Sequence, residues 1–488
     1  MKSGLYSTSD PKFAAHLIRD GILRPSGCCR TADQTTFSFE DPHGSGPALF
    51  ERFVKGEKPE RVIRAGMVLP DGFIETLSDG HLLVSRNGTE ERRDTWPLKR
   101  GKIFVPPSDV MIRERVVLLP DGPQPYGTQE QLFREISRCV HRYVDIPEAW
   151  EELVAHYVLL SWVFDAFRSL PYLRFLGSYG TGKTRMLEVA RELCYRAIEI
   201  NGASSTASIF RTLHEWRGTL AFDETDFQNS AEYAEIIKIL NSGYKADSPV
   251  LRCEGKNFTP QPFHVFGPKI LSNRTRFKDE ALESRCLTFE TSCKKTREDV
   301  PLELPSAFFQ ESRGLRNKLL QWRFDTFRKL VPEDTRINGI ELRLSQILSP
   351  LYLIASTESF RGRLLEFSKE YGSQQRQRRP EVIVLEAIGG ILAARFPKDR
   401  NKPIPLKGIA EHTDLVMSEM GLARDNDHKE LLTPKEVSVL IKGMGLEIKR
   451  YGRGRVLIVD EAALAANRRE FGLDGNREHE DEQAKEGE

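Results

Sequence analysis

The 488-residue sequence lacks the features of an exported, membrane-spanning or disulfide-rich chain. Its Met-Lys-Ser-Gly start has no apolar signal region, and the longest apolar stretch, residues 153–167, is interrupted by His156 and Asp165. The seven cysteines show no C-x-x-C spacing, which argues against structural zinc and favours idle thiols in a reducing compartment. We therefore expect a cytoplasmic chain without membrane association.

The sequence also lacks an excess of charge of either sign. Its 72 basic and 71 acidic residues give a formal net charge of +1, with 39% hydrophobic and 29% charged residues. Such a composition is typical of a soluble globular chain, and the length predicts about two to four domains. Global charge gives no argument for nucleic-acid binding, so such an argument must rest on local clusters.

A glycine-rich segment between an apolar run (172–176) and a helical pattern (185–193) carries the clearest chemistry. Its glycines let successive backbone N–H groups turn toward an anionic triphosphate at a helix N-terminus. Its lysine would contact the β- and γ-phosphates, and its threonine hydroxyl would bind Mg²⁺. A glycine-rich turn that binds nothing would not need these residues, so we expect ATP and Mg²⁺ as cofactors. The segment comprises Gly177, Ser178, Tyr179, Gly180, Thr181, Gly182, Lys183 and Thr184.

Two later apolar runs end in polar residues suited to hydrolysis. Residues 219–222 precede Asp223 and Glu224. We expect Asp223 to be a metal ligand with Thr184, and Glu224 to activate water as the general base. The run 265–271 precedes Asn273, which is our candidate for positioning that water. The alternative is that Asn273 only caps the next turn.

The triplet Ser284-Arg285-Cys286 precedes another apolar run, and with the preceding motifs it resembles the AAA+ ATPases. The resemblance implies that Arg285 is an arginine finger, which reaches the γ-phosphate bound by a neighbouring subunit. It also implies a homo-oligomer, with a ring as the expected form, and a helical lid carrying a second arginine sensor, for which Arg336 or Arg343 is available. The alternative for Arg285 is a surface arginine ahead of a strand.

The motif spacing is similar to that of primase-associated replicative helicases of phages, plasmids and integrated mobile elements. In that group a hairpin before the sensor strand touches DNA, which implies that a hairpin at 250–258 does so here. Lys245, Arg252 and Lys256 then become candidate phosphate contacts, although they are equally compatible with solvated charges on a turn. The implied function is ATP-driven unwinding of DNA, with a primase or another replication protein as a possible partner. Two alternatives stay open: an ATPase that loads or remodels another protein on DNA, and a nucleotide-switched regulatory or defence protein.

The expected fold class is α/β, with a P-loop AAA+ core containing a parallel sheet. A small α+β accessory domain (1–125) precedes the core with its brace helices (126–295), and the helical lid (296–371) follows. A polar, Gln-rich linker (372–380), a winged-helix domain (381–472) and a disordered acidic tail (473–488) complete the chain. In the winged helix, Lys442, Arg453 and Arg455 belong to a basic patch suited to DNA phosphates, with protein docking as the alternative.

Overall fold

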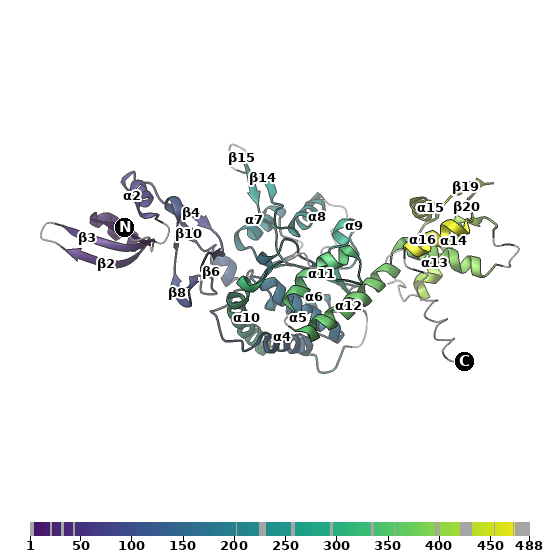
Figure 1. The fold of residues 1–488 in the computed structure, drawn as a ribbon, viewed down its shortest axis with the longest axis horizontal. Helices are drawn as coiled ribbons and strands as arrows, with labels where there is room; N and C mark the ends of the chain where they lie inside the picture. Colours follow the sequence, from purple (N-terminus) through teal and green to yellow (C-terminus); the bar gives the residue numbers. More distant parts are fainter. Residues whose placement is uncertain are drawn as a thin grey trace. The chain divides into compact units, whose positions relative to one another are not determined.

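The computed structural model forms two compact units, Met1–Asn338 with Leu342–Leu365 and Gly339–Glu341 with Glu366–Glu488. We refer to them as the first and the second unit, and each is described by itself (Figure 1). The structure describes residues 4–19, 22–30, 34–41, 44–201, 203–223, 231–254, 259–292, 296–332, 336–355, 357–395, 399, 401–419, 432–452, 454–471 and 473. Within these residues, no helix is both long enough and apolar enough to cross a bilayer.

The amino-terminal region combines short sheets with two helices, α1 (Pro11–Arg19) and α2 (Gly46–Val54). Its sheets have the orders β1-β3-β2, β4-β10-β9 and β5-β6-β7-β8. The strands are β1 (Gly4–Thr8), β2 (Arg24–Arg30), β3 (Thr35–Asp41), β4 (Glu60–Ile63), β5 (Gly66–Leu69), β6 (Gly72–Thr76), β7 (Leu82–Arg86), β8 (Thr89–Arg93), β9 (Trp96–Leu98) and β10 (Lys102–Val105).

This region shares one compact unit with the core, so the boundary expected at residue 125 does not separate two bodies. Ala65, Val117 and Leu119 are buried in the same cluster as the core strands. The carboxylate of Glu75 on β6, 2% exposed, accepts hydrogen bonds from Tyr195, Arg196 and Arg323. A buried carboxylate needs such partners, and here all of them come from the core.

The core of the first unit is a five-stranded parallel sheet with the order β12-β13-β16-β11-β17. Its strands are β11 (Tyr172–Leu176), β12 (Ile198–Ile200), β13 (Leu220–Phe222), β16 (Lys269–Asn273) and β17 (Cys286–Glu290). Every residue of β11, β13 and β16 is buried, which explains why most residues of these strands are apolar. Because the strands are parallel, their carboxyl ends lie at one edge of the sheet.

Helices α4 (Gln129–Tyr143), α5 (Glu148–Trp162), α6 (Lys183–Leu193) and α10 (Ser306–Thr326) pack against one another, and α11 (Leu342–Ile354) packs on α5. The predicted lid is therefore not a separate body: α10 and α11 belong to the first unit, and α12 (Glu358–Gln377) crosses into the second. The reason lies in α10, where Arg316 and Arg323 are buried and bonded to Glu192 and Asp165 of the core.

Helices α7 (Thr206–Trp216), α8 (Ala231–Gly243) and α9 (Glu280–Glu283) complete the first unit with the hairpin β14 (Val250–Glu254) and β15 (Thr259–Phe263). The hairpin projects from the body of this unit (Figure 1). The hairpin was predicted at 250–258, and its second strand comes later than that, because β15 begins only at Thr259. Pro260 and Pro262 are tolerated in β15 because this strand pairs only with β14 among the described residues.

The second unit contains α13 (Pro380–Ala393), β18 (Ile404–Pro405), α14 (Leu406–Glu419), α15 (Pro434–Gly443), β19 (Ile448–Tyr451), β20 (Gly454–Leu457) and α16 (Glu461–Glu470). Its strands form a sheet of order β18-β20-β19. The linker predicted at 372–380 is wrong for most of its length, because α12 continues to Gln377. Gln and Arg are good helix formers, and the first proline, Pro380, stands at the start of α13, where it is tolerated. The predicted tail lies outside the described residues except for Leu473.

Candidate nucleotide-binding site

The glycine-rich segment connects β11 to α6 at the carboxyl-terminal edge of the sheet. Gly180 and Gly182 adopt φ values of 76° and 83°, a region that other residues rarely occupy, and Gly182 is the N-cap of α6. The backbone N–H of Gly177 donates to the carbonyl of Asn273 on the neighbouring strand at 3.2 Å. The predicted strand, loop and helix are therefore present, and the loop ends at a helix N-terminus, where anions are favoured.

Lys183 and Thr184 begin α6, and each side chain makes one hydrogen bond at this edge of the sheet. The Lys183 Nζ donates to the carbonyl oxygen of Ser178 at 2.5 Å, so the ammonium group lies against the loop. The Thr184 hydroxyl donates to Asp223 Oδ2 at 3.0 Å. The structure thus brings together a hydroxyl and a carboxylate that the sequence separates, and hard oxygen ligands of this kind suit Mg²⁺.

Asn273 ends β16 beside the glycine-rich loop (177–184), which we call the phosphate loop after its expected role, and is in register with Leu176 at the end of β11. Its side chain is 2% exposed, and its Oδ1 has no hydrogen-bond partner in the part of the chain that the structure describes. A turn-capping role would pair this oxygen with a nearby N–H group, and no such pair forms in the described chain. Glu224, the expected general base, lies outside the described residues, directly after Asp223.

Tyr179 and Thr181 fill the remaining positions of the loop. Thr181 donates to the Ser178 carbonyl at 2.9 Å and contacts the Thr291 hydroxyl at 2.6 Å, which ties the loop to the chain after β17. Tyr179 is 85% exposed, and the guanidinium of Arg274 lies 5.7 Å from the centre of its ring. Arg274 was not singled out from the sequence, because its place beside the loop depends on the neighbouring strand β16.

Arg285 lies at the opposite, amino-terminal edge of the sheet, since its carbonyl accepts from the N–H of Tyr172 at the start of β11. The five residues of β11 span about 16 Å at ~3.3 Å each, farther than an arginine side chain reaches. Arg285 instead donates to Asn241 Oδ1 at 2.5 Å and lies over the ring of Tyr244 at 3.8 Å. Its guanidinium therefore cannot serve the phosphate loop of its own chain.

The two candidates for a second arginine sensor lie in different surroundings. Arg343 donates to the Ser284 hydroxyl at 3.2 Å and lies 5.7 Å from the Tyr244 ring, so it belongs to the same edge as Arg285. Burial, followed by repulsion from Arg285, lowers the pKa of Arg343. Arg336 is exposed, and it makes no hydrogen bond or ion pair with the described residues. Arg343, Asn241 and Tyr244 thus surround the predicted finger, a grouping that only the fold reveals.

A buried ion pair fixes the segment that carries Arg285. Arg174 on β11 is fully buried, and its two terminal nitrogens donate to the Glu283 carboxylate at 2.6 and 2.5 Å. Burial raises the pKa of Glu283, but Arg174 and Arg276 outweigh it and hold that pKa below its usual value. The carboxylate is therefore charged at neutral pH and anchors α9 directly before Ser284.

The residues predicted to contact DNA near the hairpin differ in exposure and in whether an acidic side chain already pairs with them. Lys245 is exposed, at the end of the segment after α8. Arg252 on β14 is paired with Glu235 of α8 and lies 4.9 Å from the Phe210 ring. An anion would have to compete with that carboxylate, which weakens the prediction for Arg252. Lys256 lies outside the described residues.

In the second unit, Lys442 at the end of α15 and Arg455 on β20 are both exposed. Arg455 lies directly opposite Arg450 in the β19–β20 register. Like charges opposite each other destabilise a strand pair, so an anion would relieve this repulsion. Arg453, between the two strands, lies outside the described residues.

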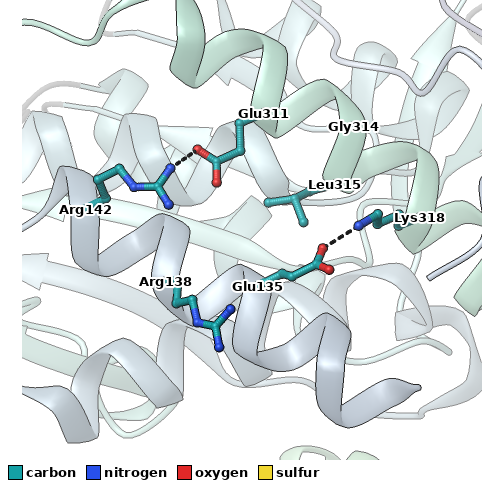
Figure 2. Close-up of a pocket in the computed structure, with 7 residues that line it drawn as sticks. All are labelled: Glu135, Arg138, Arg142, Glu311, Gly314, Leu315 and Lys318. Carbon is teal, nitrogen blue, oxygen red and sulfur yellow. Dashed lines mark hydrogen bonds and ion pairs between the residues drawn. The ribbon is translucent and has the colours of Figure 1, made fainter. Parts of the chain in front are cut away.

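A surface groove between α4 and α10 lies elsewhere and contains none of the loop residues. Figure 2 shows that its charges are largely paired across the groove, Arg142 with Glu311 at 2.7 Å and Lys318 with Glu135 at 2.6 Å. In the described residues, no three His, Cys, Asp or Glu side chains form a cluster that could hold a metal ion by themselves.

Comparison with known proteins gives similarity only to solved structures. No protein-family model matches the chain, and no curated protein sequence matches it. The active helicase Cch of SCCmec type IV is 11% identical with a TM-score of 0.39, over 84% of this chain and 81% of that one. The C-terminal region of NrS-1 is 10% identical with a TM-score of 0.34, over 85% and 99%. An MCM homolog from Methanopyrus kandleri is 12% identical with a TM-score of 0.29, over 78% and 74%.

Proposed function

We propose that this chain is a Mg²⁺-dependent ATPase of the AAA+ type that uses ATP hydrolysis to move along or unwind DNA, as the replicative helicase of a mobile genetic element. The observation that carries the ATPase proposal is the hydrogen bond between Thr184 and Asp223 below a phosphate loop with left-handed glycines. Such a hydroxyl–carboxylate pair beside a lysine is what a metal–triphosphate complex needs.

In this proposal each residue of the site has one task. The loop N–H groups and Lys183 bind the phosphates, while Thr184 and Asp223 hold Mg²⁺. Bound Mg²⁺ would neutralise charge that develops on the transferred phosphoryl group. Glu224 takes a proton from the attacking water, and the unpaired Oδ1 of Asn273 accepts a hydrogen bond from the same water. The order of the strands supports these roles. Strand β16, which ends at Asn273, lies between β11, which precedes the loop, and β13, which precedes Asp223.

We further propose that the active site is completed by a second copy of the chain in a ring. The amino-terminal edge that carries Arg285 and Arg343 lies away from the bound phosphates of the same subunit. A head-to-tail contact brings that edge to the phosphate loop of the next subunit, and repeating the contact closes a ring. Arg285 would then exchange Asn241 for the γ-phosphate, a stronger, charged partner.

DNA is the proposed partner of the hairpin and of the second unit. Helices and strands of the second unit follow the order of a winged helix, with β19–β20 as the wing. The repulsion between Arg450 and Arg455 and the exposed Lys442 and Lys245 support phosphate contacts, and a primase remains the proposed protein partner.

The first test is ATP binding by the Lys183→Ala variant. We expect affinity for a fluorescent ATP analogue to fall at least 100-fold, because a charge-assisted contact to the phosphates is lost. Lys238→Ala is the matched control, since Lys238 is an exposed lysine on α8 that pairs only with Glu235 in the described chain. Retained binding in the Lys183 variant would refute the assignment of the phosphate loop.

Strand separation decides between the helicase and its two alternatives. The helicase proposal expects the protein alone, with ATP and Mg²⁺, to separate a forked duplex. A loader or remodelling ATPase would hydrolyse ATP but need a second protein for any unwinding. A nucleotide-switched regulator would turn over slowly, at a rate that DNA does not change.

A further inference from the structure

A cavity of about 530 Å³ lies in the first unit, between the amino-terminal sheets and the core. Residues from β5, β9 and β10 form one wall, and residues before the core strands form the other. Its volume is in the range of ligand pockets, which span ~300–1,000 Å³. Four arginines line it, Arg64, Arg196, Arg217 and Arg323, together with Asp165 and His264.

The cavity is separate from the phosphate loop. Arg196 precedes β12, Arg217 precedes β13 and Phe266 precedes β16, so this wall is the amino-terminal edge of the parallel sheet. The phosphate loop occupies the opposite, carboxyl-terminal edge. A ligand here would therefore not be the hydrolysed nucleotide.

The acids at the cavity neutralise only part of its positive charge. Asp165 accepts two hydrogen bonds from Arg323, both at 2.7 Å, and Glu75 accepts from Arg323 and Arg196. Arg64 and Arg217 have no ion pair or side-chain hydrogen bond in the part of the chain that is described. The Nε of Arg217 is buried and without a partner.

The two unpaired arginines lie close enough to repel each other. Burial, followed by repulsion from Arg64 and Arg196, lowers the pKa of Arg217 to about 10. Burial also lowers the pKa of Arg64, and burial with both arginines lowers that of His264. Partly buried, uncompensated cations reduce stability, so their presence calls for a compensating anion.

The rest of the lining is apolar and includes aromatic rings. Phe104, Phe164, Phe266 and Phe327 line the cavity with Val62, Met67 and Leu98. Aromatic side chains can stack on the flat face of a nucleobase, whereas inorganic phosphate has no apolar surface for them to contact. The unpaired charge of Arg64 and Arg217 matches the charge of about −2 on a phosphate monoester near neutral pH.

We propose that this cavity is a second ligand site, which binds a nucleoside monophosphate with its phosphate at Arg64 and Arg217 and its base among the phenylalanines. The backbone supports a functional site, because Arg196 and Arg217 have φ values of 43° and 46°. Such values are strained for residues other than glycine, and strained residues cluster at functional sites. The α4–α10 groove in Figure 2 is the weaker candidate, because glutamates already pair two of its cations.

The site is tested in the Lys183→Ala background, which removes nucleotide binding at the phosphate loop. Calorimetric titration compares AMP, inorganic phosphate and a 5′-phosphorylated oligothymidine. We expect saturable AMP binding at least tenfold tighter than phosphate, and at least a tenfold loss when Arg64→Gln and Arg217→Gln are added. Arg61→Gln is the matched control, because Arg61 is exposed on β4 and does not line the cavity.

Thermal unfolding separates a ligand site from a purely structural cluster. Removing two unpaired cations should leave Tm unchanged or higher in the double variant, whereas a structural role predicts a lower Tm. AMP should raise the Tm of the Lys183→Ala protein but not that of the cavity variant. No AMP binding, binding insensitive to Arg64 and Arg217, or binding of the oligonucleotide alone would each overturn the proposal.

Discussion

Single residues show which parts of the site depend on sequence and which depend on the fold. The strand, loop and helix around Lys183 and Thr184 were predictable, because consecutive residues of the glycine-rich segment encode them. Asp223 was predictable from its place after an apolar run, and the structure confirms that it reaches Thr184. Arg217 and Glu75 carried no such pattern, since their partners are far away in the sequence. A single charged residue acquires meaning only when its neighbours in space are known.

His156 on α5 provides a residue-scale prediction about pH. It is 3% exposed, packs 4.4 Å from Phe133, and bonds through Nδ1 to the Glu152 carbonyl at 2.8 Å. Burial lowers its pKa to about 4. From pH 6.5 downward the unfolded chain gains a proton here that the folded chain does not. The free energy of unfolding should therefore fall with pH, by about 2 kcal/mol from this residue at pH 5.

Urea unfolding at pH 7 and pH 5 measures this effect. His156→Gln should show a smaller difference in unfolding free energy between the two pH values than the wild type. His81→Gln serves as the control because His81 lies half exposed on the surface. An identical pH dependence in the wild type and the His156 variant would show that His156 takes up its proton equally in both states.

At the scale of elements, apolar patterns located the core strands correctly. The end of the polar helix α12 and the second strand of the β14–β15 hairpin were predicted at the wrong positions. Strands β11, β13 and β16 are buried on both faces, so most of their residues are apolar, and the buried Arg174 on β11 needs its ion pair with Glu283. The segment 372–377 is polar and was predicted as part of a linker, yet its residues also favour helix, and α12 continues through it to Gln377. The lid at 296–371 stays a prediction, and its helical pattern did not reveal that Arg316 and Arg323 of α10 are bonded to the core.

The β19–β20 hairpin allows a prediction about DNA affinity. Arg455→Ala should weaken binding to oligonucleotides of different sequence to a similar degree, because a phosphate contact reads no bases. The slope of log affinity against log salt concentration should fall by about one, as expected for the loss of one phosphate contact. Lys407→Ala on α14 is the control, since Lys407 is exposed and pairs with Glu411. An unchanged salt slope would exclude the hairpin from the DNA contact.

At the scale of the whole molecule, the two edges of the sheet have different tasks in the proposed ring. Arg285→Ala should lose most ATPase activity while it still binds ATP, because its own phosphate loop is intact. Mixing this variant with Lys183→Ala should restore part of the activity, since some interfaces then pair an intact loop with an intact Arg285. The measurement is the ATPase rate across mixing ratios. No recovery at any ratio would argue against a site shared between subunits.

The steady-state ATPase rate, with and without single-stranded or forked DNA at two salt concentrations, tests the central claim most directly. The proposed function predicts Mg²⁺-dependent turnover that DNA stimulates, by about tenfold or more, and stimulation that fades as salt rises because phosphate contacts are screened. Turnover that DNA leaves unchanged at both salt concentrations would contradict a DNA motor and would leave an ATPase that acts on another protein or as a switch.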